Sequence, residues 1–172
     1  TAEIVDGVYT TPAVYANGIL TVAFVEQIPE NVLYVAAGGT GDGSSWEAPL
    51  GSIQDAINNA DAATPVWVMA GTYELTDVIT AVSGVNVYGG FAGTETRASE
   101  RQKSDLDENG LVEPWEFTNA TIIKPTVASK NALIIPATVT ADVIVNGITF
   151  TNGDLATGTT LVHVFGDTMT RG

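Results

Sequence analysis

Residues 66–91 read VWVMAGTYELTDVITAVSGVNVYGGF, and they give the clearest indication of the fold. Turn-forming residues divide it into three short apolar runs: Val66–Met69, Val78–Thr80 and Val85–Tyr88. Each run is too short for a helix and is rich in β-branched or aromatic residues, so the pattern predicts strands. In the last run, the alternation places Val85 and Val87 on one face of the strand and Asn86 and Tyr88 on the other.

The residues between these runs are typical of tight corners: Ala70–Thr72, Ser83–Gly84 and Gly89–Gly90. Short strands joined by such corners leave no room for crossover helices. They are typical of a solenoid, in which the backbone coils on itself.

More short apolar runs follow later in the chain: Thr121–Ile123, Ala132–Ile135, Val143–Val145, Ile148–Thr151 and Leu161–Phe165. Strands that recur roughly every dozen residues also suit a β-sandwich. Two features favour a parallel coil instead. Strands such as residues 144–150, IVNGITF, are almost continuously apolar, and the corners are only one or two residues long.

The chain before this region is predicted to contain three further elements. Residues 1–28 predict a β-hairpin or the tail of an upstream β-repeat, because residues 19–24 alternate and Asn17-Gly18 is a hairpin-type turn signal. A strand is expected within residues 31–37. Residues 52–63 predict a helix, with Ser52 as N-cap, Asp55 in the first turn and an apolar face that would cap the open end of the solenoid core.

The composition narrows the class of protein. The chain has 172 residues, 20 acids against 6 bases, a net charge of −14 and no cysteine. Nucleic acid is an unfavourable partner because phosphate binding needs clustered lysine and arginine, and disulfides and thiolate metal sites are excluded. No apolar run is long enough to span a membrane, and no signal peptide is evident. Because the chain starts at Thr1 rather than Met, we expect a piece of a longer protein.

A glycine-rich loop spans residues 38–51. Its glycines lack the following Lys-Ser/Thr and the strand–loop–helix context of a phosphate-binding loop. We therefore expect a surface loop around a buried Trp46.

Several ordered motifs resemble those of a known family: YVAAGGTGDGSSW, IQDAINNA, VWVMAGTYE, VNVYGGFAGTE and VNGITFTNG. They resemble the N-terminal rungs of right-handed parallel β-helix, pectate-lyase-like surface proteins of Bacteroidetes, and more distantly the chlamydial polymorphic outer membrane proteins. Residues 1–26 look like the closing strands of a small extracellular β-repeat. The resemblance implies an all-β, right-handed parallel β-helix over residues 29–172 and a location outside a bacterium or on its outer surface. The family includes both adhesins and polysaccharide-cleaving enzymes, so it implies no single reaction.

Residues 105–116 match the calcium-loop pattern D-x-[DN]-x-[DN]-G-x5-E in full. Gly110 would make the sharp turn of this EF-hand-like loop. The expected calcium ligands are side-chain oxygens, one backbone carbonyl and one water-mediated acid, from Asp105, Asp107, Asn109, Leu111, Glu113 and Glu116. The alternative is a solvated Asp/Asn-rich turn between two rungs. Residues 97–103 could form a short entering helix, Pro114 lies where an exiting helix would begin, and the expected role of calcium is structural.

Catalysis has little support in this sequence. Lys124 ends a strand, Lys130 lies in a turn, and His163 has no identifiable nucleophile beside it. Trp67, Tyr88 and Trp115 could stack on sugar rings, although aromatic residues in strands more often pack inside the protein. Residues 119–121 have the form of an N-glycosylation sequon, which we expect to be unmodified in a bacterial protein.

We therefore expect an exported module for adhesion, scaffolding or glycan interaction, with a structural calcium loop. The alternative is the N-terminal part of a polysaccharide lyase or glycoside hydrolase whose catalytic rungs lie beyond residue 172. Release of unsaturated sugars by the parent protein, but not by this chain, would favour the enzyme. Saturable glycan or cell binding by this chain alone would favour adhesion.

Overall fold

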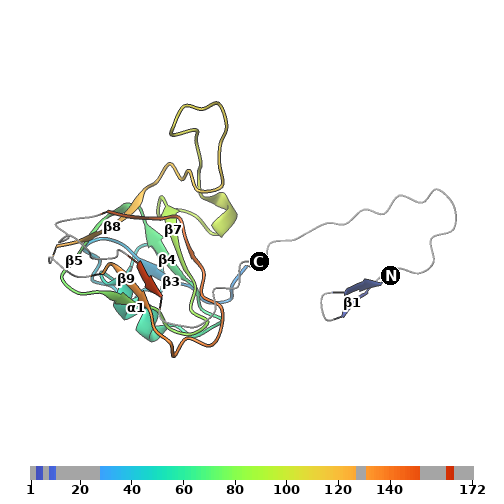
Figure 1. The fold of residues 1–172 in the computed structure, drawn as a ribbon, viewed down its shortest axis with the longest axis horizontal. Coiled ribbons are helices and arrows are strands. Elements are labelled where there is room, and N and C mark those ends of the chain that lie inside the picture. Colours follow the sequence, from blue (N-terminus) through green and yellow to red (C-terminus); the bar gives the residue numbers. More distant parts are fainter. Residues whose placement is uncertain (1–2, 6–7, 11–27, 127–130, 152–161, 165–172) are drawn as a thin grey trace.

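The computed structural model describes residues 3–5, 8–10, 28–126, 131–151 and 162–164 (Figure 1). Its elements, in chain order, are β1 (Glu3–Val5), β2 (Val8–Thr10), β3 (Leu33–Val35), α1 (Ile53–Asn59), β4 (Val66–Met69), β5 (Gly71–Leu75), β6 (Ile79–Thr80), β7 (Val87–Phe91), a 3-10 helix (Ala98–Glu100), β8 (Thr121–Pro125), β9 (Leu133–Ile135), β10 (Val145–Asn146), β11 (Ile148–Phe150) and β12 (Val162–Val164).

Ten of these strands form three parallel sheets, whose strand orders are β3-β4-β7-β10, β5-β8-β11 and β6-β9-β12. The chain visits these sheets in the same order three times, first through β4, β5 and β6, then through β7, β8 and β9, and finally through β10, β11 and β12. We call each such circuit a pass. Every strand pairs in parallel with its counterpart in the neighbouring pass. The predicted all-β fold is thus confirmed at the level of parallel sheets with little helix.

The register of these sheets stacks apolar side chains in rows. Val66 pairs with Val87, and Val87 with Val145, while Tyr73 pairs with Ile123 in the second sheet. These residues belong to one apolar cluster enclosed by the sheets. The predicted alternation is confirmed, because Val85 and Val87 are 1% and 4% exposed while Asn86 and Tyr88 are half-buried.

Helix α1 packs beside β3, β4 and β6 and buries Ile53, Ala56 and Ile57. The predicted N-cap is confirmed, since the Ser52 hydroxyl accepts a 3.1 Å hydrogen bond from the Asp55 N–H. The helix ends at Asn59 rather than at residue 63. A turn replaces the predicted last residues because the Asp61 carboxylate accepts hydrogen bonds from the Ala63 N–H and the Thr64 hydroxyl.

Two predicted corners lie inside strands. Gly71 is the first residue of β5, and Gly89-Gly90 belong to β7. A side chain at Gly89 would approach the carbonyl oxygen of Gly147 to 2.4 Å, and one at Gly90 would meet the Phe117 ring at 2.8 Å. Gly89 and Gly90 therefore mark close approaches of chain segments rather than turns.

A second apolar cluster lies on the outer face of the first sheet. Tyr34 of β3 and Trp67 of β4 pair in register, and Trp67 pairs with Tyr88 of β7. Trp67 also stacks on Phe91 at 4.7 Å with an interplanar angle of 16°. Trp46 is half-buried rather than fully buried as predicted, and its ring covers Tyr34 at 4.7 Å. This outer cluster fixes the glycine-rich loop onto the sheet.

The N-terminal strands β1 and β2 form a separate antiparallel pair, with Ile4 opposite Tyr9. The predicted hairpin turn at residues 17–18 and the alternating run at residues 19–24 lie outside the described residues. In the described part of the chain, no helix has the length and apolar character needed to cross a membrane.

Candidate metal centre

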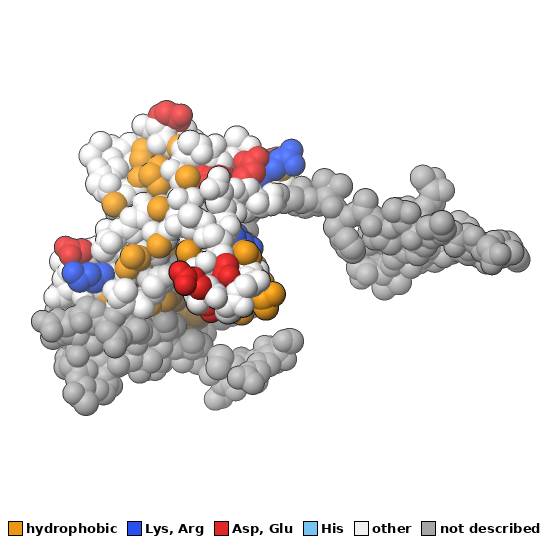
Figure 2. All heavy atoms as spheres, turned by 90° about the horizontal axis from the view of Figure 1, so that it is seen from above, with side chains coloured by type: hydrophobic (Ala, Val, Ile, Leu, Met, Phe, Trp, Pro, Cys, Tyr) orange, Lys and Arg blue, Asp and Glu red, His pale blue; other side chains and the backbone are white. Residues whose placement is uncertain are grey.

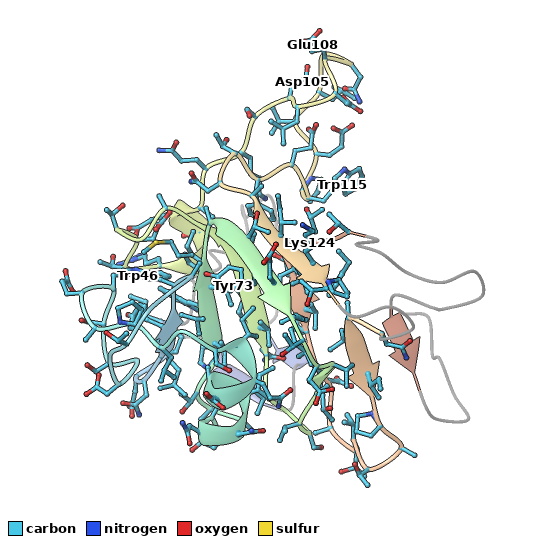
Figure 3. The ribbon with its side chains drawn as sticks, turned by 90° about the vertical axis from the view of Figure 1, so that its left-hand side faces the viewer. Trp46, Tyr73, Asp105, Glu108, Trp115 and Lys124 are labelled. Carbon is cyan, nitrogen blue, oxygen red and sulfur yellow. The ribbon has the colours of Figure 1, made fainter. Side chains whose placement is uncertain are left out.

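An insertion separates two strands that elsewhere follow one another almost directly. Between β4 and β5 stands only Ala70, and between β10 and β11 only Gly147, whereas residues 92–120 lie between β7 and β8. We call residues 92–120 the insertion. It leaves the body of sheets at one corner and projects outward (Figures 1 and 3).

The root of the insertion is fastened by Arg101. Its guanidinium donates hydrogen bonds of 2.8 Å to the carbonyl oxygens of Gly89 and Ala98, and one of 2.9 Å to Asn146 Oδ1. The same group lies 4.4 Å from the centroid of the Phe117 ring. Arg101 thus joins the insertion to strands of two passes through charge-assisted hydrogen bonds and a cation–π contact.

A buried carboxylate shapes the first turn of the insertion. Glu95 is 7% exposed and accepts hydrogen bonds from the N–H groups of Ala92, Gly93 and Thr94 at 2.7–3.0 Å. Its own carbonyl oxygen accepts a 3.0 Å hydrogen bond from the Trp46 indole. This hydrogen bond joins the first turn of the insertion to Trp46 of the outer cluster.

Two antiparallel segments, rather than two helices, flank residues 105–116, which we call the acidic loop. Lys103 and Phe117 form an antiparallel bridge, flanked by hydrogen bonds from the Thr118 N–H to the Gln102 carbonyl and from the Ser104 N–H to the Glu116 carbonyl. The expected entering helix at residues 97–103 reduces to a 3-10 turn at Ala98–Glu100, and Pro114 starts a turn rather than a helix. The flanks predicted from the EF-hand pattern are thus wrong, because the bridge fixes residues 103 and 117 as neighbours.

The loop brings three of the predicted ligands together. One carboxylate oxygen each from Asp105, Asp107 and Glu116 lie within 4.8 Å of one another. The Asp105 carboxylate also accepts hydrogen bonds from the N–H groups of Asn109 at 3.0 Å and Gly110 at 2.7 Å. Gly110 has a φ of +90°, which confirms the predicted sharp turn.

Glu116 closes the loop from its C-terminal end. It is only 5% exposed, and its two oxygens accept hydrogen bonds of 2.8 Å from the N–H groups of Glu113 and Leu106. These hydrogen bonds, with that from Glu113 the strongest influence, lower the pKa of the Glu116 carboxyl below its ordinary value. The carboxylate is therefore ionised at neutral pH, as a metal ligand must be.

Asn109 and Glu113 complete the polar side of the loop. The Asn109 amide nitrogen donates hydrogen bonds of 3.1 Å to Asp107 and to Glu113 Oε1. The other oxygen, Glu113 Oε2, is buried and has no hydrogen-bond partner among the described residues. A buried carboxylate oxygen without a partner is costly, and a cation is the partner that suits it best.

Calcium takes about six to eight oxygen ligands, including carboxylates, amide oxygens and backbone carbonyls. The donor set of Asp105, Asp107, Glu113 and Glu116 fits that preference. Asn109 fits it only after its amide turns, because its Oδ1 here accepts a 2.9 Å hydrogen bond from the Leu111 N–H. The Leu111 side chain has no oxygen, so this residue could contribute only its backbone carbonyl, and that contribution stays a prediction.

The other residues considered from the sequence have structural roles or lie elsewhere. Lys124 forms an exposed ion pair with Glu74 at 3.3 Å, and Trp67 is 1% exposed and cannot stack on a sugar. Thr121 of the sequon is fully buried, and its hydroxyl accepts a hydrogen bond from the Gly90 N–H. Lys130 and the side chain of His163 lie outside the described residues.

Sequence reasoning missed Arg101, Glu95 and the apolar side chains of the acidic loop. Arg101 contacts Gly89 and Asn146, and the Glu95 carbonyl oxygen contacts the Trp46 indole. Contacts between residues so far apart in the chain leave no local pattern. The scarcity of bases, with only 6 in the chain, is the one signal that could have drawn attention to Arg101.

Fold and site together define a mostly β domain of three parallel sheets that carries an acidic loop on an insertion. Comparison of the chain with family models, with curated proteins and with solved structures finds no match. The family resemblance of the sequence motifs stays a prediction.

Proposed function

We propose that this chain is an exported β-helix module whose insertion binds calcium and presents a surface for adhesion, scaffolding or glycan interaction. Three features support the β-helix. The chain visits three parallel sheets in a fixed order, successive strands are joined by corners as short as one residue, and α1 packs beside one side of the core. Connections between parallel strands are overwhelmingly right-handed, so we propose a right-handed coil.

The calcium site is carried by one observation, which is the convergence of Asp105, Asp107 and Glu116 within 4.8 Å. Such close carboxylates repel one another unless a cation lies among them. A bound calcium ion would supply that positive charge, and a water molecule bound to the ion would give Glu113 Oε2 a partner. Because Asp105 begins the loop and Glu116 ends it, the ion would hold the two ends together. The role of calcium in this proposal is structural.

An extracellular location fits such a site. Extracellular calcium modules bind with affinities of roughly 10⁻⁴ to 10⁻³ M. The net charge of −14 and the absence of cysteine are compatible with an exported bacterial protein, and the family resemblance of the motifs implies export as well. We propose that the module lies on the outer surface of a bacterium or in the surrounding medium.

Isothermal titration of the chelator-treated protein with CaCl2, paired with thermal melts, tests the calcium site. We expect saturable binding and a rise in melting temperature, since an ion that binds only the folded state adds about 2.7 kcal/mol at roughly 100 times its Kd. Asp105→Asn with Glu116→Gln should abolish both effects while keeping side-chain shape. Mg²⁺ should bind more weakly, because it demands near-ideal octahedral geometry.

A matched control removes the same charge elsewhere. Glu30 and Asp142 are exposed acids far from the loop in sequence, and Glu30→Gln with Asp142→Asn should bind calcium like the original chain. Equal loss of binding in both double variants would mean that calcium binding depends on the overall acidity of the surface and not on the loop. Overlapping melts with chelator and with calcium raised well above roughly 10⁻³ M would refute the site itself. Glycan screens with calcium present then test adhesion directly.

A further inference from the structure

The acidic loop also carries an exposed apolar patch. Seven large hydrophobic side chains are exposed in the described residues, and four of them belong to this one loop. These four are Leu106, Leu111, Val112 and Trp115, with exposed fractions of 58%, 67%, 57% and 72%. We call them the tip patch. Large apolar groups gathered on one short projecting loop are typical of a contact surface.

Hydrogen bonds within the acidic loop fix the backbone that carries the tip patch. The loop beneath it is fixed by hydrogen bonds from the backbone N–H groups of Leu106 and Leu111 to side chains of the same loop. Figure 3 shows Asp105 and Glu108 at the far end of the insertion and Trp115 nearer the strands, on the side of the insertion. A partner can therefore reach the patch without displacing any strand, and a pre-fixed loop loses little entropy on binding.

The charge around the patch selects the partner. Five acids belong to the same loop, and no lysine or arginine lies between Lys103 and Lys124. These acids are Asp105, Asp107, Glu108, Glu113 and Glu116. In the view down onto the insertion, acidic and hydrophobic side chains lie next to one another (Figure 2). A divalent ion would neutralise two of these five charges and leave the loop negative. A second copy of the tip and an anionic lipid surface would both be repelled.

We propose that the tip patch docks a segment of a partner protein that combines apolar side chains with lysine or arginine. Trp115 would be the central apolar anchor, because exposed tryptophan dominates the binding energy of many interfaces. The acids around the patch would steer and orient the basic side chains. The apolar contact uses side chains other than the calcium ligands, so docking does not require calcium. Four of the five steering acids are also proposed calcium ligands, so a bound ion would weaken the steering without removing the apolar contact.

Synthetic amphipathic peptides test the proposal on the intact chain. The probes are a Leu/Lys peptide, a Gln/Lys peptide of equal charge and a Leu/Glu peptide. We expect the Leu/Lys peptide to bind at least ~10-fold more tightly than either of the others, and to shift the tryptophan emission of the chain to shorter wavelength. The preference over the Gln/Lys peptide isolates the apolar contact, because non-specific attraction to an acidic protein acts on both alike.

Variants locate the contact. Val112→Ser with Trp115→Ser should reduce the preference for Leu/Lys over Gln/Lys to about one. The control, Ile28→Ser with Ile144→Ser, removes exposed apolar residues outside the insertion and should keep the preference. Because all four side chains are exposed, melting temperatures should change little.

Several results would overturn the proposal. Tight binding of the Leu/Glu peptide, or an unchanged preference in the tip variant, would do so. Sedimentation showing tip-dependent self-association would assign the patch to a second copy. Tip-dependent binding to phosphatidylglycerol vesicles would assign it to a membrane. Each measurement is made with calcium and with chelator, so loss of calcium binding and loss of docking are scored separately.

Discussion

The Arg101 guanidinium lies 2.9 Å from Asn146 Oδ1, so a residue of the insertion is hydrogen-bonded to the strand that follows it in the first sheet. Asn146 is paired with Tyr88 of β7 in register. The insertion is therefore not merely a loop added to a corner, because its root is part of the contact between two passes.

Arg101→Lys should destabilise the fold although it keeps the charge. A lysine cannot reproduce the planar set of donors that contacts Gly89, Ala98 and Asn146. We expect a loss of about 2 kcal/mol in the free energy of unfolding, measured by urea denaturation. Arg97→Lys serves as the control because Arg97 is exposed, and it should change stability by less than about 0.5 kcal/mol. Equal effects of both substitutions would contradict this role of Arg101.

Glu95→Gln should loosen the first turn of the insertion. The carboxylate accepts hydrogen bonds from three backbone N–H groups. A glutamine amide has only one acceptor oxygen, and its NH2 group would face backbone donors in place of the second oxygen. The expected cost is about 2 kcal/mol, with a change in Trp46 fluorescence because Trp46 is hydrogen-bonded to the same residue. The exposed Glu47→Gln is the comparison, and similar losses in the two variants would count against a special role for Glu95.

The sequence predicted those features that depend on local pattern. Val66–Met69 is a strand with the predicted bounds, because four apolar residues between turn signals leave little choice. Ser52 caps α1 as its position before an apolar helix face indicates. The ligand spacing of the acidic loop is also local, and it correctly brought Asp105, Asp107 and Glu116 together.

What the sequence could not predict depends on contacts between distant residues. Nothing local to Lys103 reveals its bridge to Phe117, and the expected helix failed for that reason. Gly89-Gly90 looked like a corner because glycine is common in turns, whereas here each lies against a segment of another part of the chain. The exposure of the tip patch could not be predicted either, because it also depends on contacts between distant residues.

Gly147→Ala should be strongly destabilising. Gly147 has a φ of +71°, where an L side chain is strained, and a new Cβ would lie 2.5 Å from the carbonyl oxygen of Gly89. Strain alone costs roughly 1–2 kcal/mol, and the backbone clash adds to it. Gly38→Ala isolates the strain, because Gly38 has a φ of +74° and open space around its Cα. Chemical denaturation of both variants should show the larger loss for Gly147, and equal losses would mean that the two passes can move apart at no cost.

The 3-10 turn at the root of the insertion should respond to acid. Hydrogen bonds from the N–H groups of Thr96 and Arg97, with Thr96 the larger influence, lower the pKa of the Glu100 carboxyl below its ordinary value. A carboxylate whose pKa is lower in the folded state stabilises the protein above its unfolded pKa, and this contribution is lost as pH falls through the folded pKa. Glu100→Gln should therefore be less stable than the original chain at about pH 7, and the difference should shrink as pH falls below about 4. Urea denaturation of both proteins across this range measures the difference directly. A gap that stays constant or widens in acid would show that the carboxylate charge does not support the turn.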